Sequence, residues 1–116
     1  MVDLRPRQDE VWLVTLDPSV GAEIRKTRPC LVVSPNEINA HLATVIIAPM
    51  TTSIRSYPSR VTAVFQDKTG QIALDQPRTV DRVRLVHRLG RLDRQCLAHV
   101  ADRLARMFAR PDLAQL

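Results

Sequence analysis

Residues 11–18 read Val-Trp-Leu-Val-Thr-Leu-Asp-Pro. The first six are apolar or favour extended backbone, so they predict a strand over 11–16. Asp17 and Pro18 end that strand, because proline has no N–H to donate to a sheet ladder. The residues that follow, as far as Thr27, include Gly21 and several charges, which indicates a loop with hairpin character.

Short strand-like stretches continue along the rest of the chain. The second predicted strand covers 30–34, bounded by Pro29 and Pro35, and a short helical turn follows over 35–41. The third covers 43–50 and is expected to be central, because its middle is apolar on both faces. Further strands are predicted at 60–65, 71–74 and 85–92, with a turn at 67–70, a loop at 75–79 and a short helical turn at 80–83.

The C-terminal part predicts one amphipathic helix over 93–110, with Asp93 as its N-cap and Pro111 as its stop. Its apolar stripe is expected to pack on the core and consists of Leu97, Val100, Leu104 and Phe108. Several short strands and one terminal helix in 116 residues predict a single mainly β domain over 1–116, built as a small barrel. Residues 1–8 are expected to form a flexible N-terminus.

The charge of the chain is basic and comes mostly from arginine. Lys and Arg total 17 against 12 Asp and Glu, a formal net charge of +5, and Lys26 and Lys68 are the only lysines. A soluble basic surface or an anionic partner, most often a nucleic acid, would both explain this balance. Because Trp12, Tyr57, Phe65 and Phe108 are the only aromatic residues, an RNA contact is expected to rely mainly on phosphates and base edges.

The spacing of the cysteine and histidine residues predicts neither a disulfide framework nor a zinc site. Cys30 and Cys96 both fall in apolar patterns and are expected to be buried free thiols, as suits a reducing cytosol. No carboxylate cluster or zinc-type spacing occurs, so neither a metal nor a cofactor is expected. With no apolar signal core and no run of membrane-spanning length, the sequence favours a cytoplasmic protein without a membrane contact.

Residues 23–28 gather several charges into one short loop: Glu23, Arg25, Lys26 and Arg28. One interpretation is a solvated loop, and the other is a phosphate-handling loop of a protein that cuts RNA. Arg28 stands at the start of an apolar strand that would hold its guanidinium rigidly, and Thr51 follows another buried strand. Guanidinium and hydroxyl donors can stabilise the phosphorane that forms when a 2′-hydroxyl attacks its own phosphate.

Motifs spread over roughly residues 9–108 resemble, in the same order, the MazF/PemK (Kid-like) toxins, the mRNA interferases of type II toxin–antitoxin systems. They are residues 11–18, Gly21-Ala22-Glu23, Thr27-Arg28-Pro29, Ala48-Pro49-Met50-Thr51-Thr52-Ser53, residues 74–81 and Leu89-Gly90-Arg91-Leu92. The resemblance implies an SH3-like β-barrel with a C-terminal helix, acting as a homodimer. It also implies metal-independent, sequence-specific cleavage of single-stranded RNA to 2′,3′-cyclic phosphate and 5′-hydroxyl ends, restrained by a cognate antitoxin.

Two catalytic positions carry over residue by residue. Arg28 matches the family's arginine before proline and would stabilise the phosphorane and donate to the leaving oxygen, whereas Thr51 would hold the phosphate. One branch of the family pairs an arginine with an aspartate; here Asp75 is present, but Ala73 occupies the arginine position. Asp75 could act as a base, accept from a base edge or simply cap a turn.

The remaining candidates are RNA contacts on two loops and on the segment after residue 74. The set comprises Ser19, Glu23, Arg25, Lys26, Thr52, Ser53, Asp75 and Gln76. Gln76 can read base edges through both ends of its amide. Arg78 and Thr79 are expected to brace a loop, and the histidines His41, His87 and His99 leave open a two-histidine ribonuclease.

Two other functions fit a small basic barrel. A CcdB-like inhibitor of DNA gyrase would need a Trp-Gly-Ile ending, whereas this chain ends Asp-Leu-Ala-Gln-Leu. An RNA-binding barrel without catalysis would not need both Arg28 and Thr51. The leading hypothesis is therefore an endoribonuclease whose antitoxin carries an acidic, disordered segment that folds on the basic groove.

Overall fold

The computed structural model describes residues 5–110. The elements follow one another as β1 (Glu10–Thr15), β2 (Thr27–Val32), α1 (Asn36–His41), β3 (Thr44–Thr51), β4 (Arg60–Phe65), β5 (Lys68–Ala73), β6 (Arg78–Asp81), the 3-10 turn η1 (Arg82–Arg84), β7 (Leu85–Arg91) and α2 (Arg94–Phe108). Part of the expected flexible N-terminus, residues 1–4, and the expected helix stop Pro111 lie outside the described residues.

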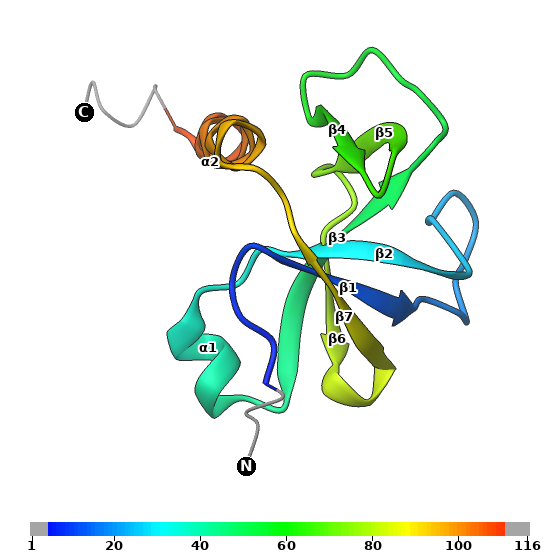
Figure 1. Cartoon of the computed structure of the whole chain (residues 1–116), viewed down its shortest axis with the longest axis vertical. Helices are drawn as coiled ribbons and strands as arrows, with labels where there is room; N and C mark the ends of the chain where they lie inside the picture. Colours follow the sequence, from blue (N-terminus) through cyan, green and yellow to red (C-terminus); the bar gives the residue numbers. More distant parts are fainter. Residues whose placement is uncertain (1–4, 111–116) are drawn as a thin grey trace.

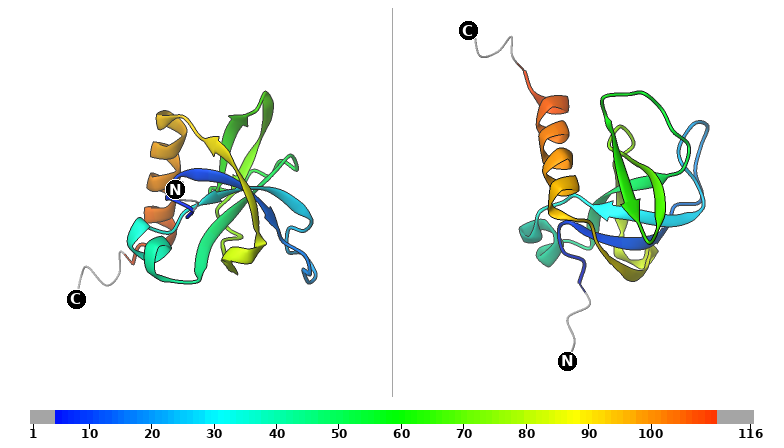
Figure 2. Two further views of the ribbon diagram at one scale, coloured as in Figure 1. Left: turned by 60° about the horizontal axis from the view of Figure 1, so that its bottom comes forward. Right: turned by 45° about the horizontal axis from the view of Figure 1, so that its top comes forward.

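The strands form one antiparallel sheet in the order β4-β5-β3-β2-β1-β7, and β6 pairs with β3. Strand β3 holds the sheet together because it changes partner along its length. It pairs with β6 over Thr44–Ile47, with β2 over Ile47–Pro49, and with β5 at Met50 and Thr51. The sheet curls strongly around this strand into a half-barrel (Figures 1 and 2). The predicted mainly β fold with a C-terminal helix is thus confirmed.

Each face of the curled sheet carries its own apolar cluster, because successive side chains of a strand point to opposite faces. On one face Val11, Leu31 and Ala48 pack with residues of β4, β5 and α2. On the other face Trp12, Cys30 and Ile47 pack with Val45 and Val80, among others. The prediction that the third strand is central and apolar on both faces is therefore confirmed.

The C-terminal helix α2 lies against β4, as Figure 2 shows. Asp93 caps it, since its side chain accepts a hydrogen bond of 2.8 Å from the Cys96 N–H. The predicted stripe is wrong at its last position, because Phe108 is 60% exposed and Met107 packs against the core instead. Counted from Val100 at about 100° per residue, Met107 returns to the core face, whereas Phe108 turns about 80° away.

Several predicted boundaries differ from the structure, and the larger differences arise because pairing with a neighbouring strand extends or creates a strand. Strand β2 begins at Thr27 rather than at residue 30, so Pro29 lies inside it, opposite Leu13. Pro29 is tolerated there because it lies one residue beyond the pairs that β2 makes with β3, where a second N–H donor is not needed. The turn predicted at 67–70 is shorter, since Gln66 and Asp67 alone take positive φ values of 50° and 64°.

The remaining differences concern segments that follow this turn. Strand β5 starts at Lys68, because the two-residue turn lets Lys68 pair directly with Phe65. The predicted loop at 75–79 and helical turn at 80–83 are partly wrong, because Arg78–Asp81 form β6 against β3 and the 3-10 turn follows at Arg82–Arg84. The local sequence of β5 and of β6 does not show which strand each of them pairs with.

Candidate active site

Arg28 and Thr51 lie where β2 and β3 separate. Residue pairs join the two strands from Cys30 to Val32, and β3 then pairs with β5, so that Thr51 lies opposite Gln71. The Arg28 guanidinium bridges the opening: its Nη1 donates to the Met50 carbonyl at 3.3 Å, and its Nε donates to the Arg25 carbonyl at 2.8 Å. The side chain is therefore held between a strand and the β1–β2 loop, and it remains partly exposed.

Thr51 carries a hydroxyl whose orientation is constrained. Its Oγ1 accepts a hydrogen bond of 3.1 Å from the Ser53 N–H, which leaves the O–H free to donate outward. Gly70 lies directly behind this residue, and a Cβ there would stand 2.7 Å from the Thr51 carbonyl oxygen. The position of Thr51 thus depends on a residue without a side chain on β5.

Three neighbouring hollows make up one surface feature, which we call the groove. The first, about 250 Å³, is lined by Arg28, Thr51, Thr52 and Lys68 among others. The second, about 410 Å³, shares Thr51 with the first and is lined by Ser53, Arg55, Tyr57, Arg60, Asp75 and Gln76, beside Ala22 and Ile24. The third, about 370 Å³, shares the last four of these and adds Glu23, Pro49, Pro77 and Arg78.

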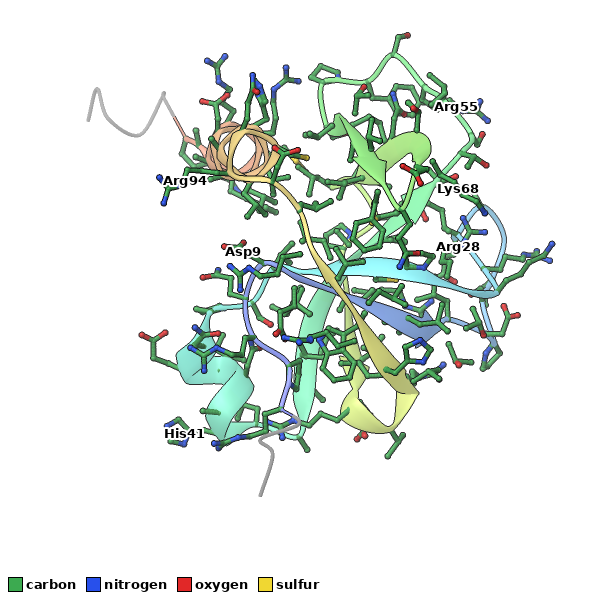
Figure 3. The ribbon with its side chains drawn as sticks, viewed as in Figure 1. Asp9, Arg28, His41, Arg55, Lys68 and Arg94 are labelled. Atoms are coloured by element: carbon green, nitrogen blue, oxygen red, sulfur yellow. The ribbon has the colours of Figure 1, made fainter. Side chains whose placement is uncertain are left out.

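The groove carries a concentration of basic side chains. Figure 3 shows Arg28, Lys68 and Arg55 along the same side of the molecule, whereas Asp9, His41 and Arg94 lie elsewhere. Thr51 lines both the hollow of Arg28 and the hollow of Asp75, so it stands between them. A chain of phosphates could therefore follow the basic side chains past Thr51.

The β1–β2 loop closes one side of the groove and is pinned by side chains from a distant part of the sequence. The Gln76 amide accepts from the Ile24 N–H at 2.7 Å and donates to the Ala22 carbonyl at 3.4 Å. The Arg78 Nη1 donates to the Leu16 carbonyl at 3.0 Å and to Ser19 Oγ at 3.4 Å. The prediction that Arg78 braces a loop is confirmed, and a base contact by Gln76 would require its amide to release the loop.

Asp75 is already engaged by an arginine from another strand. The Arg60 Nε lies 2.7 Å from its Oδ1, the Arg60 Nη2 lies 3.2 Å from its Oδ2, and Ser59 Oγ donates to Oδ1 at 3.0 Å. Burial opposes the ionisation of Asp75, but the hydrogen bonds and charge of Arg60 outweigh it, so the pKa of Asp75 lies below its ordinary value. A carboxylate held in this way is a weak proton acceptor near neutral pH.

The arginine beside Asp75 was missed by reasoning from the sequence, which looked for it at position 73. Arg60 lies directly opposite Ala73 in the β4–β5 ladder, so its guanidinium reaches Asp75 from across the hairpin. A two-residue turn at 66–67 would have predicted that Arg60 pairs with Ala73, because the length of a hairpin turn determines which residues face each other. A turn at 67–70 gives a different pairing and therefore misses the contact between Arg60 and Asp75.

The sequence also matches known proteins. Residues 7–108 match the family described as PemK-like, MazF-like toxin of type II toxin–antitoxin system. This chain belongs to the PemK/MazF toxin family. The match spans nearly all of the described residues, including both strands that carry Arg28 and Thr51.

Individual relatives and solved structures support the assignment to the PemK/MazF family. The chain is 35% identical over 102 residues to the endoribonuclease PemK of Escherichia coli, covering 83% of this chain and 77% of the relative. It is 31% identical over 110 residues to the endoribonuclease MazF9 of Mycobacterium tuberculosis, covering 84% and 92%. The fold is similar to the crystal structure of MazF from Deinococcus radiodurans, with a TM-score of 0.79, 27% identity, and coverage of 90% and 97%.

A further structure similar to this PemK/MazF chain is a complex. It is described as an endoribonuclease with its cognate antitoxin from a mycobacterial species, with a TM-score of 0.74, 26% identity, and coverage of 87% of this chain and 92% of that chain. These relatives support the ribonuclease interpretation and not the CcdB-like alternative.

The other predicted RNA contacts of this PemK/MazF chain lie on loops, and only some of them line the groove. Glu23 Oε1 accepts from the Val20 N–H at 2.6 Å, and the Lys26 N–H donates to Asp17 Oδ1 at 3.2 Å. Arg25 supplies the carbonyl that receives Arg28, and Thr52 and Ser53 follow Thr51 along the rim. Of the candidate RNA contacts, Glu23, Thr52, Ser53, Asp75 and Gln76 line the groove of this PemK/MazF chain. Ser19, Arg25 and Lys26 are not among the residues that line its three hollows.

The three histidines do not gather at the groove. His41 ends α1, His87 lies on β7 and His99 lies on α2, and none of them lines the groove. The alternative of a two-histidine ribonuclease therefore finds no site in this PemK/MazF fold. Within residues 5–110, no group of three or more His, Cys, Asp or Glu is placed to hold a metal ion. Nor is any helix there long and apolar enough to cross a bilayer.

Proposed function

We propose that this protein is the toxin of a type II toxin–antitoxin system and cuts single-stranded RNA at a short sequence motif. The observation that carries the proposal is the Arg28 guanidinium, held at the opening between β2 and β3 beside the Thr51 hydroxyl. The names of the relatives, endoribonuclease PemK and endoribonuclease MazF9, support the same chemistry.

The proposed reaction is an attack by the RNA's own 2′-oxygen on the adjacent phosphorus. The bond from phosphorus to the 5′-oxygen breaks, which leaves a 2′,3′-cyclic phosphate and a 5′-hydroxyl end. Arg28 stabilises the negative charge of the phosphorane and donates a hydrogen bond to the departing 5′-oxygen. Arg28 does not act as the base, because a guanidinium stays protonated in proteins. Water receives the 2′-hydroxyl proton, and a water molecule returns a proton to the departing 5′-oxygen, which becomes the 5′-hydroxyl.

Thr51 holds the phosphate in this scheme. Because the Ser53 N–H already occupies an acceptor site of Thr51 Oγ1, the hydroxyl proton is available for a phosphate oxygen. The groove on either side of Thr51 takes the neighbouring nucleotides. The predicted contacts to them come from Ser19, Glu23, Arg25, Lys26, Thr52, Ser53, Asp75 and Gln76, and the loops 19–26 and 52–58 select the motif.

The proposed partners follow from the same surface. The protein acts in the cytoplasm as a homodimer, needs no cofactor and is restrained by an antitoxin with an acidic, disordered segment. Support for an antitoxin comes from the similar endoribonuclease solved with its cognate antitoxin. The basic groove is electrostatically suited to an acidic segment as well as to RNA.

The test is incubation of the purified protein with a long RNA in EDTA, followed by mapping of the cut sites and of the end chemistry. We expect cuts at one short motif with cyclic phosphate ends. Arg28→Ala should reduce kcat by about 10²- to 10³-fold, the range for loss of one charge-stabilising donor. Its melting temperature should remain close to that of the original protein, because the side chain is partly exposed.

Arg94→Ala is the matched control, since it removes an exposed arginine on α2 away from the groove (Figure 3). It should cut at the original rate. Absence of cutting by the unaltered protein, or full activity of Arg28→Ala, would contradict the proposed function.

A further inference from the structure

We infer that Tyr57 is a stacking platform for one unpaired base of the RNA, next to the phosphate that is cut. The inference rests on the proposed ribonuclease function and adds to it a base-binding subsite in the second hollow of the groove. Tyr57, Arg60 and Asp75 all line that hollow. The ligand of the subsite is a nucleobase, and its binding energy comes from ring stacking.

Tyr57 differs in exposure and position from the other aromatic residues of the chain. Its side chain is 50% exposed and lines the second hollow. Trp12 is only 8% exposed, and Phe65 lines the first hollow but packs against the core beside Gly90. Phe108 is 60% exposed but lies at the end of α2, outside the groove. Tyr57 is therefore the aromatic ring that can offer a free face to a base within the second hollow.

One face of the Tyr57 ring is supported from within the protein. The Arg60 guanidinium carbon lies 5.3 Å from the ring centroid, within the range of a cation–π contact. The Arg60 side chain is itself only 6% exposed and is held by two hydrogen bonds to the Asp75 carboxylate. Asp75 thus fixes Arg60, and Arg60 fixes the ring, which leaves the opposite face of the ring for a ligand.

The backbone around Tyr57 is anchored at four points, although it belongs to a long loop. The Gln71 side chain binds the Arg55 N–H at 3.0 Å and the Arg55 carbonyl at 2.9 Å. The Arg60 N–H donates to the Tyr57 carbonyl at 3.0 Å, and the Leu74 N–H donates to the Ser59 carbonyl at 3.1 Å. Because the ring is held in advance, little conformational entropy is lost when a base stacks on it.

The hollow beside the ring has the polar groups needed to hold the edge of a base. Ser53 and Arg55 line it together with Tyr57, and its volume is about 410 Å³. Thr51 lines both this hollow and the hollow of Arg28, so a phosphate held at Thr51 has its next nucleotide here. The inferred occupant is therefore the base of a nucleotide that directly flanks the cut.

The first experiment compares Tyr57→Ala, Tyr57→Phe and the control Phe108→Ala on a short RNA with one cut site. Loss of one base–aromatic stack should lower kcat/KM of Tyr57→Ala by about 5- to 150-fold. Tyr57→Phe should stay within about twofold, because stacking needs the ring and not the hydroxyl. Phe108→Ala removes an exposed ring outside the groove and should leave kcat/KM unchanged.

The second experiment places an abasic nucleotide at each position of the same RNA in turn. With the original protein, one position that flanks the cut should lose activity by a factor similar to the Tyr57→Ala loss. With Tyr57→Ala, the abasic nucleotide at that position should cause no further loss, since the stack is already absent. Independent, multiplicative losses would show that Tyr57 does not contact that base, and would overturn the inference.

The outcomes separate this inference from the proposed function. If the original protein cuts RNA but Tyr57→Ala cuts it equally well, the subsite is refuted and the ribonuclease function stands. If Tyr57→Phe loses as much as Tyr57→Ala, the ring is not the source of binding, and the inference is also refuted. If the original protein does not cut RNA at all, both proposals are refuted. Circular dichroism of each variant confirms that it remains folded.

Discussion

Removing Asp75 from its ion pair with Arg60 should lower the free energy of unfolding more than removing Arg60. The Arg60 side chain is 6% exposed, whereas the Asp75 side chain is 29% exposed. Asp75→Ala leaves a buried guanidinium without its carboxylate, a change that costs about 3–5 kcal/mol when a pair is fully buried. Because water reaches the Asp75 side, we expect a loss of about 2–3 kcal/mol in the free energy of unfolding.

Arg60→Met should cost less than Asp75→Ala. It leaves a carboxylate that keeps the bond from Ser59 and can be hydrated, and the methionine preserves much of the packing of the arginine stem. The expected loss is about 1 kcal/mol, including the contact with the Tyr57 ring. The exposed pair of Arg106 and Asp102, whose side chains are 76% and 51% exposed, provides the control, because Asp102→Ala should cost about 0.5 kcal/mol or less.

The contribution of Asp75 to the free energy of unfolding should change with pH in one direction. The pKa of Asp75 is lowered in the folded protein, so its stabilising contribution is complete above the unfolded value, about 3.9, and is lost as the pH falls below it. The difference in unfolding free energy between the original protein and Asp75→Ala should thus stay constant from about pH 5 to 8 and shrink below about pH 4. Other carboxylates are common to both proteins and cancel in the difference.

Urea unfolding followed by the fluorescence of Trp12, the only tryptophan, measures these differences. The reasoning is refuted if Arg60→Met costs as much as Asp75→Ala, or if the difference for Asp75→Ala persists unchanged at pH 3. Either result would mean that the carboxylate is not held by the buried guanidinium in solution.

Two further predictions concern Gly70 and the cysteines. Gly70→Ala should place a Cβ against the Thr51 carbonyl, which lies 2.7 Å away, and so displace Thr51. We expect at least a tenfold fall in the RNA cleavage rate and a loss of about 1–3 kcal/mol in the free energy of unfolding, with Arg94→Ala on α2 as the control. Unchanged cleavage by Gly70→Ala would show that this contact does not position Thr51. Burial raises the pKa of the Cys30 thiol to about 12 and raises that of Cys96, so iodoacetamide at pH 8 should label both slowly in the folded protein and rapidly in urea. Rapid labelling of Cys30 in the folded protein would contradict its burial.

Local sequence patterns predicted most of the elements because their causes are local. Runs of apolar, β-forming residues marked the strands that contain Val14 and Ile47, and alternation marked the strand that contains Val61. Asp93 marked the start of α2 through its cap. The free, buried state of both cysteines was also predicted correctly from their apolar neighbours. In each case the deciding interaction involves residues close together in the chain or the simple exclusion of apolar groups from water.

Element boundaries and the groove required the tertiary structure. Pro29 reads as a strand boundary, yet it lies inside β2 because β1 pairs alongside it and β3 has already turned away. Likewise, Arg78 reads as part of a loop until β3 supplies its partner at Ile47. These pairings bring together residues far apart in the chain, and a local pattern carries no information about the partner strand.

Local sequence patterns suffice to predict a small, basic, mainly β chain with a C-terminal helix, and the motifs carry the family resemblance that singled out Arg28 and Thr51. The surroundings of these two residues depend on how the strands pair in three dimensions. The turn at Gln66 and Asp67 pairs Arg60 with Ala73, which brings the Arg60 guanidinium to Asp75, and the change of partner along β3 opens the groove at Thr51. Register and strand exchange are properties of the whole sheet, so the neighbours of a catalytic residue emerge only when every strand has found its partner.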